Sequence, residues 1–437
     1  MRFLPCHPTW LIAACCLLLP AEVLGDPRWI SVSFVDADTS TRAGISWADE
    51  AEGGDIVQWG LTAGALDRTT LATRAEVPDI GLFRNAVLDD LRPDTKIFYR
   101  VGGPQGWSGI NSFWTGPVDF CEPVRFAVLG DGRGARDGVS PIFREVLSRA
   151  LEDDPAFVLD TGDLVREGRE GEDWVKWLDA TDGLLGGVFH MPTVGNHDDG
   201  PGRGARANFN RVFQVPRNGT MQAEDLYFFT YGPVAVAVLN SALFGTEPGN
   251  DEARKQAAWL ELMLGRHPRP WRVVVLHHPL RTSRGVLGIG HPPDEHGQNA
   301  ALLPVLDRLE VDLVFQGHVH WYERFLPSRP ADAPAPSETD ETPFRGTVHI
   351  TTGGAGAPTM RCWLVLSPAE GSQVCADTNH YTLVEIDRER VRIRARAAGP
   401  EGGDRILDDI SWTKALPHGT VCEPKAPNPP PAPGGAP

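Results

Sequence analysis

Apolar and polar residues follow two different patterns along the chain. Between about residues 28 and 118, turn-rich pieces separate short runs in which apolar and polar residues alternate: ISVSFV, GISWA, DIVQWG, RNAVLDDL and KIFYRVG. Such alternation is typical of half-buried strands bounded by turns. We therefore predict a small all-β sandwich over residues 28–118.

From residue 124 onward the pattern changes to continuous apolar runs between amphipathic segments. The apolar runs predict strands at 124–129, 157–160, 234–240, 272–276 and 312–315. The amphipathic segments predict helices at 141–153, 172–180, 252–264 and 302–310. Continuous apolar strands between helices indicate sheets buried on both faces, which is the α/β class. In such folds, active sites gather beyond the carboxyl ends of the strands.

Asp, Asn or His residues follow the predicted strands at 124–129, 157–160, 272–276 and 312–315, and also the apolar stretch MPTV (191–194). The five strand ends read GD (130–131), TGD (161–163), GNHD (195–198), HHP (277–279) and GHVH (317–320). A glycine in several of them lets the backbone turn tightly beside a site. His318 and His320 lie two apart on an extended segment, so both rings can face one point. Oxygen and imidazole ligands without thiolate suit a pair of hard to borderline metal ions.

Composition sets the class of protein and limits its partners. The chain has 437 residues, of which 41% are hydrophobic and 23% charged, as expected for two or three globular domains. Its net charge of -17 argues against a nucleic-acid or anionic-membrane partner held by bulk charge. An anionic substrate therefore needs a local positive centre.

The two ends of the chain differ from the rest. Residues 1–25 contain one Arg, an apolar run from Trp10 to Leu19 and a plausible cleavage site after Gly25, which predicts a signal peptide and a secreted or periplasmic protein. No later segment reaches ~18 uninterrupted apolar residues, so we expect no integral membrane span. Cleavage before Cys15, giving a lipoprotein, is a minor alternative. The Pro-rich residues 423–437 predict a disordered tail.

Four cysteines lie beyond the predicted signal peptide. An even number in an exported chain suggests two disulfides, and four cysteines allow three pairings. We prefer Cys362 with Cys375, which closes a short loop, and Cys121 with Cys422, which ties the start of the large domain to its tail.

The joint order of the five strand-end motifs resembles the calcineurin-like metallophosphoesterases, and within them the purple acid phosphatases. The resemblance includes GHVHWYER and TVHITTGGAGAP (347–358), and LRPDTKIFYRVG followed by SFWTGP is similar to the end of a fibronectin type III domain, with Tyr99 as its corner tyrosine. It covers nearly all of the mature chain. It implies a four-layer αββα sandwich over residues 123–414, preceded by a fibronectin type III-like domain over 28–118.

The resemblance also implies a site with two metal ions, of Fe, Zn or Mn. Its first ion would be bound by Asp131, Asp163 and His320. Its second ion would be bound by Asp163, Asn196, His277 and His318. Three further residues would act in catalysis: His197 facing the phosphate, Asp198 orienting the ring of His197, and His296 as another substrate-facing histidine. His278 points away from His277 on an extended segment, which indicates a structural role.

Two positions depart from the family pattern. Arg166 stands where purple acid phosphatases carry the tyrosine that binds ferric iron and gives the colour, and Arg133 stands where other metallophosphoesterases use a histidine. The first ion therefore keeps only three of its usual protein ligands, which predicts a colourless protein with a loosely held first ion. Either guanidinium could bind phosphate oxygens. The alternative is a structural ion pair with a carboxylate such as Glu167, Glu170 or Asp198.

These features predict a secreted phosphomonoesterase. By the family mechanism, a metal-bound hydroxide attacks phosphorus and His197 protonates the leaving oxygen. A phosphodiesterase using the same site is one alternative, because the ligands determine the chemistry and not the leaving group. A catalytically dead surface binding protein is the other. The sequence leaves the natural substrate and the oligomeric state open.

Overall fold

The computed structural model describes residues 27–49, 53–201, 206–219, 225–245, 251–284, 291–328, 346–362, 368–399 and 403–416. The predicted signal peptide, the predicted tail and Cys422 lie outside these ranges. Within them, no helix is long and apolar enough to cross a membrane.

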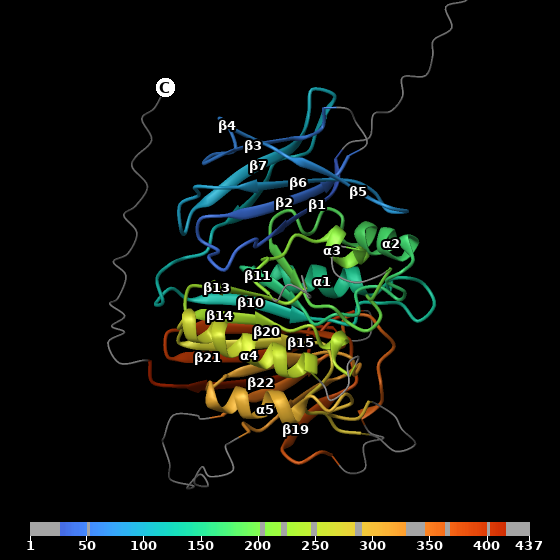
Figure 1. Cartoon of the computed structure of the whole chain (residues 1–437), viewed down its shortest axis with the longest axis vertical. Helices are drawn as coiled ribbons and strands as arrows, with labels where there is room; N and C mark the ends of the chain where they lie inside the picture. Colours follow the sequence, from blue (N-terminus) through green and yellow to red (C-terminus); the bar gives the residue numbers. More distant parts are fainter. Residues whose placement is uncertain are drawn as a thin grey trace, which may run out of the picture.

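The first sheet has ten strands and joins the amino-terminal part of the chain to the larger domain. Its order is β22 (Ile406–Thr413), β21 (Arg390–Ala397), β20 (His380–Asp387), β10 (Val124–Leu129), β11 (Phe157–Asp160), β12 (Phe189–Pro192), β1 (Arg28–Ser33), β2 (Ala43–Ala48), β6 (Gly81–Leu88) and β5 (Thr73–Val77). Strands β10, β11 and β12 are parallel, and β1 pairs with β12 in parallel. Four of the blue amino-terminal strands in Figure 1, β1, β2, β5 and β6, thus continue this sheet.

A five-stranded sheet completes the amino-terminal part. It contains β4 (Arg68–Leu71), β3 (Ile56–Gly60), β7 (Lys96–Gly103), β8 (Gly106–Trp107) and β9 (Asn111–Trp114). Tyr99 of β7 is fully buried, and its hydroxyl donates to the carbonyl of Gly186 at 2.6 Å. Gly186 belongs to the larger domain. The predicted corner tyrosine therefore links the two parts of the chain rather than bonding within its own sandwich.

A seven-stranded sheet faces the central strands of the first sheet. Its order is β13 (Tyr227–Tyr231), β14 (Val234–Val238), β15 (Trp271–Leu276), β16 (Leu313–Gln316), β18 (Val348–Thr352), β17 (Tyr322–Phe325) and β19 (Ser372–Ala376). Strands β14, β15, β16 and β18 are parallel. Aromatic rings fill the space between the sheets, for example Phe157 edge-on to Phe229 with 5.6 Å between centroids.

Helices cover the outer faces of both sheets. Helices α1 (Phe143–Glu152), α2 (Gly171–Thr181) and α3 (Asn208–Val212) pack on the ten-stranded sheet. Helices α4 (Asp251–Arg266) and α5 (Asn299–Arg308), yellow and orange in Figure 1, pack on the seven-stranded sheet. In α1 the buried residues recur at helical spacing: Phe143, Val146, Leu147 and Ala150. The predicted four-layer αββα arrangement is confirmed.

One predicted disulfide is present. Cys362 and Cys375 are bonded, with 5.9 Å between their Cα atoms. The other predicted pair includes Cys422 and so lies outside the described residues.

Candidate metal centre

The predicted ligands meet where strands of the two facing sheets end. The ends of β10, β11 and β12 carry Asp131, Asp163 and Asn196. The ends of β15 and β16 carry His277, His318 and His320. Because the strands within each group are parallel, their carboxyl ends share one edge of their sheet.

Unusual backbone conformations bring these side chains together. Asp131, Asp163 and His318 have φ angles of 59°, 55° and 68°. This left-handed region is rare for residues other than glycine, costs of order 1–3 kcal/mol each and is concentrated at functional sites. Gly195 has a different role, because a Cβ atom there would overlap Oδ1 of Asp163. The glycine before Asn196 therefore allows the two loops to approach each other.

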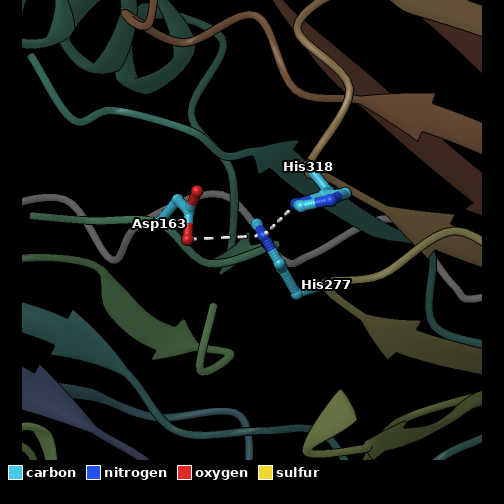
Figure 2. Close-up of side chains that lie close together, drawn as sticks. All are labelled: Asp163, His277 and His318. Atoms are coloured by element: carbon cyan, nitrogen blue, oxygen red, sulfur yellow. Dashed lines mark hydrogen bonds and ion pairs between the residues drawn. The ribbon is translucent and has the colours of Figure 1, made fainter. Parts of the chain in front are cut away.

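Four of the predicted ligands form one tight cluster. Nε2 of His277 lies 3.0 Å from Oδ1 of Asn196, 3.2 Å from Nδ1 of His318 and 3.3 Å from Oδ1 of Asp163. Figure 2 shows Asp163, His277 and His318 pointing toward one another. Ligand atoms of these three residues all lie within 4.8 Å of one another.

The hydrogen bonds of the two histidines show that this cluster fits a metal ion. Nδ1 of His277 lies 2.8 Å from the carbonyl of Thr161, which can only accept, so Nδ1 carries the proton and Nε2 keeps its lone pair. Nε2 of His318 faces a carboxylate oxygen of Glu295 at 3.1 Å, which likewise leaves the lone pair on Nδ1. Two nitrogen lone pairs, an amide oxygen and a carboxylate oxygen thus face each other. A cation satisfies all four.

Glu295 is a functional residue that the sequence reasoning missed. Its carboxylate contacts His318 and lies 3.7 Å from Nδ1 of His291, whose ring packs on His318 at 3.8 Å between centroids. A carboxylate on the far nitrogen of a ligating histidine fixes the ring and makes it more basic. Residues 291–297, HPPDEHG, contain Glu295, but the sequence pattern indicated only His296 in this segment.

We expect Glu295→Gln to weaken metal binding about 10- to 100-fold, because the amide is a poorer acceptor for the ring N–H of His318. Competition with a chromogenic chelator measures the effect. Asp294→Asn is the matched control, because the neighbouring Asp294 accepts from the backbone of Asn299 at 2.7 Å instead of holding a ligand. Equal affinity of both variants and the wild type would remove Glu295 from the site.

The three ligands predicted for the first ion lie near each other, but Arg133 lies among them. Nε2 of His320 is 3.5 Å from Oδ1 of Asp131. Nε of Arg133 donates to Oδ2 of Asp163 at 3.1 Å, and Nη2 lies 3.4 Å from Nε2 of His320. The carboxylate partner of Arg133 is thus Asp163, not Glu167, Glu170 or Asp198. With the guanidinium in this position, the first set of ligands does not fit a metal ion.

Burial and neighbouring charges keep Asp163 and His320 in their ligating forms, whereas they favour the neutral form of Asp131. Burial raises the pKa of Asp163, but its interactions with His277, His197 and Arg133 outweigh burial and bring the pKa to about 2. Burial, and then Arg133, lower the pKa of His320 to about 4. Burial, reinforced by the charge of Asp163, raises the pKa of Asp131. The histidine is neutral and Asp163 ionised at neutral pH, as metal binding requires.

The prediction that Asp198 orients the ring of His197 is wrong. The buried carboxylate of Asp198 accepts from the backbone N–H groups of four residues, at 2.8–3.1 Å: Asp163, Leu164, Val165 and Gly195. Nδ1 of His197 instead lies 2.6 Å from the carbonyl of Arg166, and its backbone N–H donates to Oδ1 of Asp163 at 3.0 Å. Asp198 therefore shapes the loop that carries Asp163, and Arg166 orients the ring through its carbonyl.

His278 and His296 form a layer behind the ligands. The ring centroid of His278 lies 4.6 Å from those of both His318 and His296, and its Nδ1 lies 2.9 Å from Oγ of Ser241. Oγ of Ser241 also accepts from the backbone N–H groups of His277 and His278, at 3.2 and 2.8 Å. His278 is structural, as predicted, whereas the structure places His296 against His278 and outside the ligand cluster.

Comparisons with known proteins give the same family for both parts of the chain. Residues 124–322 match the calcineurin-like phosphoesterase family, and residues 27–115 match the purple acid phosphatase N-terminal domain. Metallophosphoesterases of this family use a dinuclear metal site.

Relatives and solved structures extend this similarity over most of the chain. An uncharacterized protein of Mycobacterium tuberculosis is 30% identical over 409 residues, which cover 76% of this chain and 75% of that protein. Acid phosphatase type 7 of Mus musculus is 26% identical over 89% of this chain and 91% of its own length. The purple acid phosphatase PPD1 from yellow lupin seeds has the same fold, with a TM-score of 0.73 and 19% identity over 89% of this chain and 74% of its own. The chain belongs to the calcineurin-like metallophosphoesterases of the purple acid phosphatase type.

Proposed function

We propose that the protein is an exported, metal-dependent phosphomonoesterase. The observation that carries the proposal is the cluster in which Asn196, His277, His318 and Asp163 turn four acceptor atoms toward one point. The names of the mouse and lupin relatives support phosphate monoesters as the substrate class. The predicted signal peptide at residues 1–25 supports export.

The chain supplies the positive charge that a phosphate ester needs. A metal ion held by the cluster would supply a Lewis acid for a phosphoryl oxygen and for the activation of water. Asp163 would ligate the ion, and Asp198 holds its backbone by accepting from the N–H groups of Asp163 and Leu164. Arg166 is exposed beside His197, where its guanidinium can bind a phosphate oxygen.

His197 is the residue that protonates the leaving group. Its Nδ1–H donates to the carbonyl of Arg166, which leaves Nε2 to face the substrate. When Nε2 is protonated, the ring can give that proton to the departing oxygen. The same arrangement argues against the binding-protein alternative, because a buried carboxylate and a backbone carbonyl position His197 and its loop for chemistry.

Hydrolysis assays with two chromogenic substrates test the proposal. The metal-free protein would be reconstituted separately with Mn²⁺, Zn²⁺ and Fe²⁺, then assayed with para-nitrophenyl phosphate and with bis(para-nitrophenyl) phosphate. We expect metal-dependent turnover with a higher kcat/KM for the monoester. A higher value for the diester would make the protein a phosphodiesterase, and no turnover with any ion would support the binding-protein alternative.

The residue at position 166 predicts the colour of the iron-loaded protein. Purple acid phosphatases owe their colour to a tyrosinate on ferric iron, and this chain has Arg166 at that position. We expect the protein loaded with ferric iron to show no strong visible charge-transfer band. An absorption spectrum over the visible range checks this, and an intense band there would contradict it.

A further inference from the structure

Arg133 shares the bridging carboxylate with the metal cluster. Oδ1 of Asp163 faces Nε2 of His277 at 3.3 Å, and Oδ2 accepts from Nε of Arg133 at 3.1 Å. In a dinuclear site, both ions would share this carboxylate. In this chain the guanidinium of Arg133 donates a hydrogen bond to Oδ2 of this carboxylate.

The other contact of the guanidinium also uses an atom of the first ligand set. Nδ1 of His320 lies 2.9 Å from the carbonyl of Pro358, so Nδ1 carries the proton and Nε2 keeps its lone pair. That lone pair faces Nη2 of Arg133 at 3.4 Å. Arg133 thus contacts the carboxylate of Asp163 and the lone-pair nitrogen of His320, two of the groups that would ligate the first ion.

The backbone holds Arg133 in this place. Its N–H donates to the carbonyl of Asp163 at 3.0 Å, and the residue forms an isolated β-bridge with Val139. Its side chain is 17% exposed. The guanidinium therefore enters the site from an ordered loop and stays partly exposed.

The sequence supplies a second, independent observation. The two positions where family members complete the shell of the first ion, 133 and 166, both carry arginine. A guanidinium stays protonated and has no lone pair for a metal. A metal ion bound to Oδ2 of Asp163 and Nε2 of His320 would also lie against a fixed positive charge.

We propose that the guanidinium of Arg133 takes the place of the first metal ion, so that the chain binds one catalytic ion where its family binds two. The proposal deepens the phosphomonoesterase function and rests on it. Of the five N–H donors of the guanidinium, two contact Asp163 and His320, and the others can bind a phosphoryl oxygen opposite the single ion. Arginine thus supplies the second positive group of a dinuclear site.

Metal counting with Mn²⁺ tests the proposal without an activity assay. Apo protein would be titrated with Mn²⁺, and bound metal counted by mass spectrometry of the native protein. Electron paramagnetic resonance would then distinguish a lone ion from an exchange-coupled pair. We expect the wild type to bind one ion per chain with an uncoupled spectrum. Two tightly bound, coupled ions in the wild type would overturn the proposal, as would no tightly bound ion.

Two variants make the test specific. Arg133→His restores the residue type that other family members use at this position, and we expect it to bind two coupled ions. Arg166→Ala removes the same charge from an exposed neighbouring position, and we expect it to keep one ion. An Arg133→His protein that binds one ion and keeps wild-type thermal stability would contradict the proposal.

Two outcomes for the wild type separate this proposal from the proposed function. A wild type that binds one ion but shows no turnover would overturn the proposed function alone. A wild type that binds two ions and shows turnover would overturn only the Arg133 proposal.

Discussion

Asp163→Ala is expected to lose its bound metal and its hydrolytic activity together. The carboxylate of Asp163 faces Nε2 of His277 at 3.3 Å, in the cluster that also contains His318 and Asn196. Without it, the cluster presents neutral ligands beside the unpaired charge of Arg133, whose described ion-pair partner is Asp163. Metal affinity should fall by more than the ~100-fold that marks the loss of a residue that only orients a ligand. Elemental analysis after gel filtration and the monoester assay measure the two losses.

A control must separate loss of the metal from loss of a buried carboxylate. Asp312 is suitable, because it precedes β16 and so lies at the opposite end of the strand that leads to His318. Its carboxylate is nearly buried and binds Nζ of Lys414 at 2.6 Å. Asp312→Ala should lower thermal stability but keep metal and turnover. If Asp163→Ala kept wild-type activity, the assignment of the site would be wrong.

The ligand positions could be predicted from the sequence because each ligand lies in or directly after the short turn that follows an apolar strand. In a parallel sheet, a polar residue directly after an apolar strand lies at the carboxyl edge whatever the loops do. Asp131, Asp163, Asn196 and His277 were found in this way, and the structure brings them to one place. The helices were equally predictable, since the pattern at 252–264 became α4 at Asp251–Arg266.

Contacts between loops could not be predicted in the same way. Asp198 follows His197 directly in the chain, which suggested a pair, but its carboxylate turns back onto the N–H groups around Asp163. The direction of a loop side chain depends on backbone angles that no period in the sequence encodes. Glu295 was missed for the same reason, because its contact with His318 spans 23 residues.

The carboxy-terminal strands and the domain junction were missed for different reasons. The alternation in RVRIRARA, now β21, is a strand signal that could have been used. The pairing of β1 with β12 could not have been predicted, because the sequence pattern assigns β1 to the amino-terminal sandwich and β12 to the larger domain. The single pair of Val32 opposite Phe189 makes one sheet of two predicted domains.

His197→Ala is expected to keep its metal and lose turnover, which distinguishes it from Asp163→Ala. The side chain of His197 contacts the carbonyl of Arg166 and no predicted ligand among the described residues. Loss of a general acid typically lowers kcat by about 10² to 10⁴. The effect should depend on the leaving group, because para-nitrophenolate departs readily without a proton and an alkoxide does not.

Comparison of two monoesters with different leaving groups therefore tests whether His197 donates a proton. We expect His197→Ala to lose much more activity toward an alkyl phosphate than toward para-nitrophenyl phosphate, with unchanged metal content. His267→Ala is the matched control, because His267 lies before β15, at the opposite end of that strand from His277. Equal losses for both substrates would mean that His197 binds the phosphoryl group without donating a proton. In that case the leaving oxygen must take its proton from water. The hydrogen bond between Nδ1 of His197 and the carbonyl of Arg166 would then only orient the ring to bind the phosphoryl group.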